Sequence, residues 1–214
     1  MKKLSIINEN IFDGIGKRSK GGIVRKENYV ESVDLGFPSG TIWATCNLGA
    51  SSPEEWGDYY AWGETEPKDK YSWNTYKFGT ENNLTKYNEK DGKTILDPED
   101  DVAHVVLGGK WHIPTREQIQ ELIDNTTNKH SELNGVKGTL FKSKTNNNTL
   151  FFPHSGFKSG TNVYVIHACH YWSSSLDEKS YNHAIRVYSD IYNSTLTCFY
   201  RSIGHLVRGV LDKK

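Results

Sequence analysis

The segment Tyr171-Trp-Ser-Ser-Ser-Leu decides the fold class of this chain of 214 residues. It begins a series of short strand-like runs, and residues 183–188, 195–200 and 206–211 continue the series. Each run combines aromatic or β-branched residues with small polar ones, a composition typical of strands. Upstream, Thr149-Leu-Phe-Phe-Pro is a further apolar strand candidate. The C-terminal half is therefore predicted to be rich in strands and loops.

Two short helices are expected before this half, which makes the chain α+β. The first follows Asp97-Pro98, with acidic residues 99–101 in the first turn, where the helix dipole favours anions. Its expected apolar face consists of Val102, Val105 and Val106.

The second helix has a capping box, because Thr115 precedes the helix and Gln118 follows three residues later. Ile119, Leu122 and Ile123 supply its buried stripe.

The remaining N-terminal half contains one clear strand pattern. Apolar residues alternate with other residues along 41–48, which predicts a strand. Residues 51–90 hold many aromatic rings and few aliphatic side chains, so a long ordered loop packed by its own rings is expected. Residues 1–30 are interpreted as an N-terminal arm, and residues 31–214 as one ligand-binding domain.

Composition excludes several classes of protein. Lysine plus arginine equals aspartate plus glutamate at 26 each, so the chain lacks the cationic excess that nucleic-acid and membrane-surface binders need. No apolar window is long enough to predict a transmembrane helix, and Asn8 and Glu9 interrupt the only segment that resembles a signal peptide. We expect neither nucleic-acid binding nor membrane insertion.

The three cysteines, Cys46, Cys169 and Cys198, show no CxxC spacing, and their odd number excludes complete internal pairing. Three free thiols are expected, although Cys169 and Cys198 could form a disulfide in an oxidising compartment.

Several ordered motifs resemble a known family. Leu35-Gly-Phe-Pro-Ser-Gly-Thr-Ile-Trp-Ala, Trp56-Gly-Asp-Tyr-Tyr-Ala-Trp-Gly-Glu-Thr, Gly109-Lys-Trp-His-Ile-Pro-Thr-Arg and Arg201-Ser-Ile-Gly-His-Leu-Val-Arg are similar to the Fibrobacter succinogenes major paralogous domain, common in Bacteroidetes. The resemblance covers roughly residues 33–210 and implies a C-type-lectin-like fold, related to formylglycine-generating-enzyme-like domains. Trp62, Trp111, Trp172 and Arg208 would be scaffold residues.

The same arrangement resembles the variable proteins of diversity-generating retroelements. In those, adenine-directed mutagenesis rewrites a C-terminal segment within a fixed frame, which here would be Trp172-Ser-Ser-Ser, Ala184, Gly204 and Val207-Arg208. The positions that the resemblance marks as variable and ligand-binding are Tyr164, His167, Cys169, His170, Tyr181, His183, Tyr188, Asp190, Tyr192, Phe199, Tyr200, Ile203 and His205.

The residue types support a binding surface independently of any family. Six of the twelve tyrosines and four of the eight histidines lie between residues 164 and 205. Tyrosine offers a large apolar area with a hydrogen-bonding tip, as antibody paratopes use it. Alternation along strands would place many of these side chains on one exposed face. The alternative is an ordinary aromatic β core, which the interspersed Ser, Asp and His residues disfavour.

Other chemistry is weakly supported. Glu66-Pro67-Lys68 lacks the amide ligand of a mannose-type calcium site, and helix capping explains the carboxylates at 97–101. His167, Cys169 and His170 lack a fourth zinc ligand. A formylglycine-generating-type oxidase would need Cys169 and Cys198 as a pair. We therefore expect no cofactor, no metal and no catalysis.

The sequence thus predicts a non-catalytic ligand-recognition protein that binds a protein or glycan on a cell surface, itself located on a cell surface or a phage particle. The alternative is a structural or adhesive surface domain without a hypervariable site.

Overall fold

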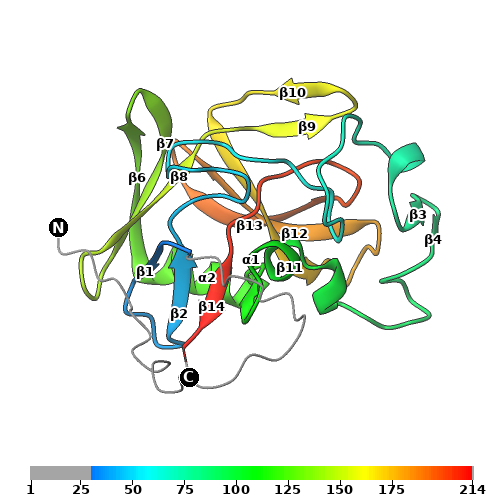
Figure 1. The fold of residues 1–214 in the computed structure, drawn as a ribbon, viewed down its shortest axis with the longest axis horizontal. Coiled ribbons are helices and arrows are strands. Elements are labelled where there is room, and N and C mark those ends of the chain that lie inside the picture. Colours follow the sequence, from blue (N-terminus) through cyan, green and yellow to red (C-terminus); the bar gives the residue numbers. More distant parts are fainter. Residues whose placement is uncertain (1–29, 214) are drawn as a thin grey trace, which may run out of the picture.

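The computed structural model describes residues 30–213, and these residues form a mostly β structure with two α-helices (Figure 1). The predicted α+β class is confirmed at this level. The predicted arm, residues 1–30, lies outside the described residues except for Val30. No helix within residues 30–213 is long and apolar enough to cross a membrane.

Both ends of the described chain meet in one antiparallel sheet (Figure 1). Trp43 pairs with Val33 on one side and Val210 on the other, so the first and last strands lie on either side of the same strand. The strands, in order across the sheet, are β1 (Ser32–Asp34), β2 (Thr41–Ala44), β14 (Val210–Asp212) and β5 (Trp111–His112).

The strands β2 and β14 are shorter than predicted. All four residues of β2 are buried, so it is covered on both faces and the expected two-faced alternation along 41–48 is wrong. Residues 206–209, predicted as strand, bond to several segments: Leu206 bonds to β11, Val207 to the segment after β2, and Gly209 to Ala44 of β2. The backbone N–H of Leu48 donates to the Val207 carbonyl at 3.1 Å, for example.

A second sheet contains β6 (Thr126–Leu133), β7 (Val136–Ser143) and β8 (Thr149–Pro153). The strand at residues 149–153 is confirmed, whereas β6 and β7 were not predicted. Asn134 and Gly135 connect them with φ of 49° and 84°, the left-handed values that a two-residue hairpin turn requires. The sequence of β6 is mostly polar, so it lacks the alternation of apolar and polar residues that would predict a strand.

The third sheet carries the region of the predicted site. Its strands β11 (Ala168–Leu176), β12 (His183–Asp190) and β13 (Ser194–Tyr200) are antiparallel with β12 in the centre. All three predicted strands of this region are confirmed. A separate hairpin, β9 (Phe157–Ser159) with β10 (Asn162–Tyr164), lies above this sheet in Figure 1.

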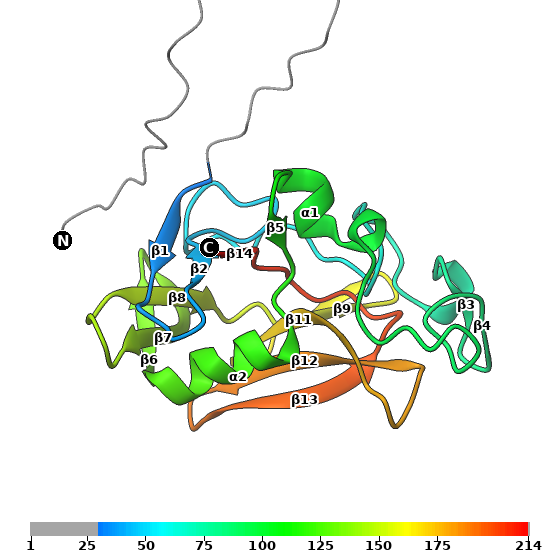
Figure 2. The same cartoon turned by 90° about the horizontal axis from the view of Figure 1, so that it is seen from below.

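The helix α2 (Arg116–Asn125) confirms its prediction. Thr115 and Gln118 form the expected capping box, and Ile119 and Leu122 are buried. The helix packs beside β12 and β13, on the side of the molecule away from α1 (Figure 2).

The first predicted helix begins later in the chain than expected. A 3-10 turn, η2 (Pro98–Asp100), precedes α1 (Val102–Leu107), and the cap is Asp101, whose carboxylate accepts from the His104 N–H at 3.0 Å. Val105 and Val106 are 47% and 44% exposed, so their predicted burial is wrong. The helix buries Val102, as predicted, together with Ala103. It begins four residues later than Asp97-Pro98 indicated.

The aromatic segment 51–90 is held to the main core. It contains only η1 (Trp73–Thr75), β3 (Gly79–Thr80) and β4 (Asn83–Leu84), as expected for a long ordered loop. Its Trp62 indole donates to the Ser173 carbonyl of β11 at 2.9 Å. In return, the Trp172 indole of β11 donates to the Tyr60 carbonyl at 2.8 Å. The rings thus pack against β11 as well as against one another.

Candidate functional site

The thirteen predicted site residues differ in exposure. Tyr192 is 84% exposed, Tyr164 47% and Tyr200 39%, and His167 is also exposed. Ten of the thirteen therefore reach solvent, four exposed and six partly. The partly buried members are Tyr181, His183, Tyr188, Asp190, Phe199 and Ile203.

The other three predicted contact residues, Cys169, His170 and His205, are buried, with at most 2% of each side chain exposed. Every residue of β11 is buried, because α2 and β7 pack against it and Phe157 contacts His170. A strand exposes alternate residues only where one face meets water. The prediction that these three side chains lie on the surface is wrong.

Phe157 of β9 joins predicted residues from separate strands. Its ring stacks on Tyr164 of β10, with centroids 5.2 Å apart and planes at 15°. It also lies 5.6 Å from the ring of Phe199 on β13 and 5.6 Å from that of His170. His170 in turn contacts Tyr188 at 5.3 Å. Phe157 carries no sequence signal of a site residue, because it lies in a short link between turns.

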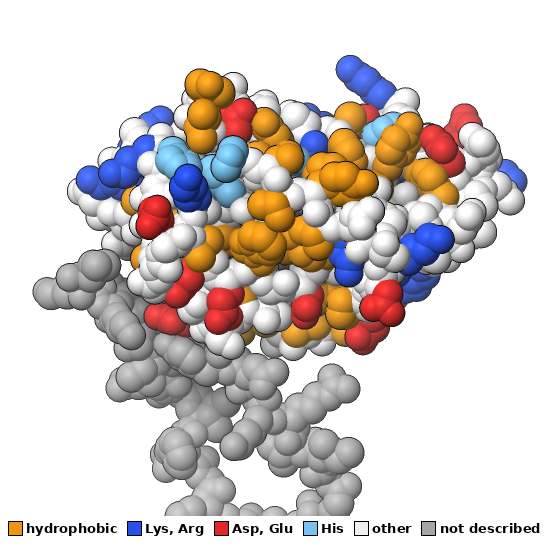
Figure 3. Space-filling view, turned by 90° about the horizontal axis from the view of Figure 1, so that it is seen from above, with side chains coloured by type: hydrophobic (Ala, Val, Ile, Leu, Met, Phe, Trp, Pro, Cys, Tyr) orange, Lys and Arg blue, Asp and Glu red, His pale blue; other side chains and the backbone are white. Residues whose placement is uncertain are grey.

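Exposed apolar side chains lie next to Tyr164 in the sequence. Val163, Tyr164, Val165 and Ile166 are consecutive and between 40% and 60% exposed. Figure 3 shows hydrophobic side chains gathered on the face that carries β9 and β10. Contiguous exposed apolar area of this kind commonly marks an interaction site. We call the surface formed by residues 163–167, 188–192 and 199–200 the candidate surface.

Asp190 shapes one border of the candidate surface. Its Oδ1 accepts from the backbone N–H groups of Tyr192 at 2.8 Å and Asn193 at 3.0 Å, and its Oδ2 accepts from the Tyr188 hydroxyl at 3.1 Å. The bonds from these N–H groups hold the pKa of Asp190 below its usual range. Asp190 therefore forms the turn that presents Tyr192.

The opposite border is aromatic. His183 stacks on Tyr200 with centroids 4.4 Å apart, and Trp73 meets the same tyrosine edge to face at 6.1 Å. Tyr181 lines a polar hollow of about 290 Å³ next to this border, together with Glu81, Asn82, Leu84, Asn88, Ser180 and Asn182.

Arg186 is a charged residue near the candidate surface that the sequence did not mark as a site residue. Its side chain is 7% exposed, and its guanidinium carbon lies 4.3 Å from the centroid of the Phe199 ring. Burial lowers the pKa of Arg186 to about 10. In the sequence it alternates with Ile185 and Val187 as an outward-facing polar residue would, so nothing indicated its burial.

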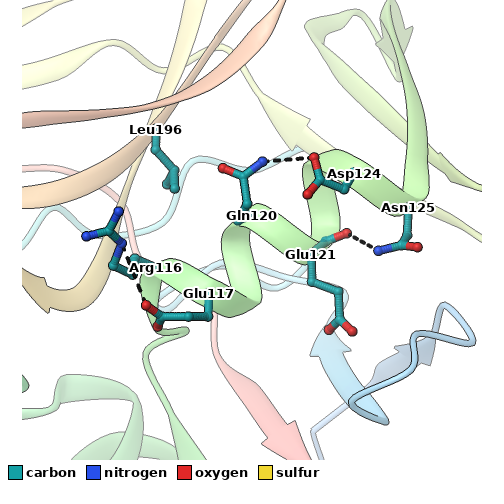
Figure 4. A pocket seen from close by; sticks show the side chains of 7 residues that line it. All are labelled: Arg116, Glu117, Gln120, Glu121, Asp124, Asn125 and Leu196. Carbon is teal, nitrogen blue, oxygen red and sulfur yellow. Dashed lines mark hydrogen bonds and ion pairs between the residues drawn. The ribbon is translucent and has the colours of Figure 1, made fainter.

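A larger hollow lies outside the predicted set. It has a volume of about 450 Å³ and opens between α2 and Leu196 of β13 (Figure 4). Its remaining lining is Arg116, Glu117, Gln120, Glu121, Asp124 and Asn125. Several of these side chains form hydrogen bonds with other residues of α2. For example, the Gln120 side-chain amide donates to the Asp124 carboxylate at 2.8 Å.

One acidic group among residues 30–213 could hold a metal ion, namely Asp97, Glu99 and Asp100. The Lys86 ammonium contacts all three carboxylates, at 2.7, 3.2 and 2.6 Å. Lys77 also pairs with Asp100 and Lys93 with Asp97, so three ammonium groups balance the three carboxylates. Among the described residues, His167, Cys169 and His170 do not come together as a group of zinc ligands.

The cysteines Cys169 and Cys198 lie on β11 and β13, with β12 between them. Their partners on β12, Ser189 and Ile185, are four residues apart. A disulfide requires Cα atoms within about 7 Å, which this arrangement does not allow. All three cysteines are free, as expected, and the pair that an oxidase would need does not form.

Comparisons of the chain with protein-family models, with curated proteins and with solved structures gave no match.

Proposed function

We propose that this protein is a non-catalytic ligand-recognition protein with a C-type-lectin-like scaffold, and that the candidate surface binds a protein or glycan on a cell surface. The observation that carries the proposal is the division between frame and surface. Trp172 and Arg208 are sealed in the core, whereas Tyr164, Tyr192 and Tyr200 project into solvent. Exposed tyrosines on a rigid frame give large contact area at low conformational entropy cost.

The hydrogen bonds of Arg208 in the frame do not depend on the exposed positions. Arg208 donates to the side chain of Asn47 and to the carbonyls of Ala44, Thr45 and Phe151, and none of these bonds involves a predicted variable position. Tyr192 is 84% exposed, so its replacement should have a small effect on stability. This separation suits diversification by a retroelement, which is the second part of the proposal.

Binding is tested with the triple variant Tyr164→Ser, Tyr192→Ser and Tyr200→Ser on a panel of bacterial cells and an immobilised glycan array. Each lost tyrosine contact at an interface costs on the order of 1 kcal/mol, so the triple variant is expected to bind at least about tenfold more weakly. The control is Val105→Ser with Val106→Ser, which removes exposed apolar area on α1. Equal binding by the triple variant and the unchanged protein contradicts the proposal.

Diversification has a separate test. Close relatives should differ mainly at exposed positions of residues 163–205, and the neighbouring DNA should encode a reverse transcriptase and a template repeat. Differences spread evenly along the chain would favour a structural or adhesive domain without a hypervariable site.

A further inference from the structure

Three buried arginines in the described chain differ in how their guanidinium groups are satisfied. Arg201 is fully buried and donates from all three nitrogens, to the Tyr76 hydroxyl and to the carbonyls of Lys86, Tyr87 and Tyr181. Arg208 is likewise satisfied through all three nitrogens. Buried cations paired in this way are structural, because their hydrogen bonds offset the lost hydration.

Arg186 lacks this satisfaction. Its Nε donates to Thr197 Oγ1 at 3.2 Å, and its Nη1 contacts Nδ1 of His170. Within residues 30–213, Nη2 has no hydrogen-bond partner, and no carboxylate forms an ion pair with the guanidinium. Nη2 is also absent from the fully sealed polar atoms of the described chain, so it retains contact with solvent.

Asp190, two residues beyond Tyr188 on the same strand, forms no ion pair with Arg186. Asp190 already accepts from Tyr188, Tyr192 and Asn193. The other side chains around Arg186 are uncharged or aromatic, with Phe199 and Tyr188 rings at 4.3 and 5.9 Å. A guanidinium stacked on rings keeps its edge free for a planar acceptor.

We propose that Arg186 binds a carboxylate of the ligand, supplied by an aspartate or glutamate side chain of a protein. This rests on the proposed function, since the free edge lies beside Tyr188 and Phe199 of the candidate surface. One cation in an otherwise neutral setting matches a singly charged anion, whereas a phosphate dianion would leave a buried negative charge. Arginine and carboxylate form paired, charge-assisted hydrogen bonds.

The neighbouring surface favours a protein over an acidic sugar. Val163, Val165 and Ile166 are exposed and offer no side-chain hydrogen bonds, which a hydroxyl-rich sugar would need. A protein interface combines such an apolar area with a few buried charged pairs.

The probe is N-acetylglutamate amide, titrated at constant ionic strength while the Arg186 Nε–H signal is followed by NMR. We expect a saturable shift, none with N-acetylglutamine amide, and a response to glucuronate at least about tenfold weaker. Arg186→Lys keeps the positive charge but lacks the paired N–H donors of the guanidinium, and it should bind the probe more weakly, as measured from the backbone amide signals of residues 186–188 in both proteins. No shift with the glutamate probe, or equal binding of glucuronate, overturns the inference.

Stability provides a second readout. Arg186→Met should leave the urea unfolding midpoint unchanged or raise it, because it removes an incompletely paired buried cation. Arg201→Met is the matched control and should lower the midpoint. Equal losses would make Arg186 a structural residue and overturn the inference. If the tyrosine triple variant loses cell binding while the probe does not bind, the anion site fails and the candidate surface stands. If the probe binds the unchanged protein but that protein binds no cells, the candidate surface fails and the anion site stands.

Discussion

Phe157 stacks on Tyr164 across the hairpin of β9 and β10, with 5.2 Å between ring centroids and 15° between planes. The pair connects a half-buried ring to an exposed one, so a residue of the frame determines where a residue of the candidate surface lies. The same Phe157 ring also contacts Phe199 and His170.

Phe157→Ala should therefore destabilise the fold and displace Tyr164. We expect a loss of about 2–3 kcal/mol in the free energy of unfolding, below the cost for a fully buried phenylalanine. Tyr164→Ala is the control, with an expected loss of about 1 kcal/mol or less because the ring is half exposed. Urea unfolding of both variants measures the difference, and equal losses would contradict the assignment of Phe157 to the frame.

Gly156 controls the approach of the same hairpin. It has a φ of 64°, and a Cβ there would lie 1.8 Å from the carbonyl oxygen of Tyr164. Gly160 has a similar φ of 57°, but its Cβ would meet nothing within 4 Å. Gly160→Ala should cost about 1 kcal/mol from backbone strain alone, and Gly156→Ala clearly more. Thermal unfolding compares the two, and similar melting temperatures would refute the close approach.

Acid should destabilise the protein through buried histidines. Burial and the nearby His130 and His167 lower the pKa of His154 to about 4, and burial lowers the pKa of His205 well below its usual value. The unfolded chain then binds more protons below about pH 6.5, so this contribution to stability is complete above that pH and declines as the pH falls toward 4. Urea unfolding at about pH 7.5 and about pH 5 measures the loss. His154→Asn should reduce the difference, and an unchanged difference in this variant would contradict the assignment.

Thiol reactivity should follow burial. Cys198 is exposed, whereas burial raises the pKa of Cys169 to about 12. Because the thiolate is the reactive form and the Cys169 thiol is buried, iodoacetamide should modify Cys198 and leave Cys169 unmodified in the folded protein. Mass spectrometry of native and urea-treated samples identifies the sites, with Cys198→Ser as control. Rapid native labelling of Cys169 would show that β11 is not sealed.

Local sequence rules predicted those features that depend on neighbouring residues. The capping box at Thr115, the buried Ile119 and Leu122, and the strands around Trp172, Val187 and Leu196 follow from patterns of a few residues. Such patterns reflect short-range hydrogen bonding and side-chain periodicity. The hairpin of β6 and β7 was missed because its residues are mostly polar.

Tertiary structure alone decided which candidate residues reach the surface. From the sequence, Cys169, His170 and His205 were predicted to be exposed binding residues like Tyr192. Residue type alone does not show which other segments pack against a side chain. Long-range packing on β11 buried the first three, and a turn held by Asp190 left Tyr192 in solvent. The same packing left Arg186 without a carboxylate. Burial and charge pairing depend on segments distant in the chain, and a single sequence does not encode their contacts locally.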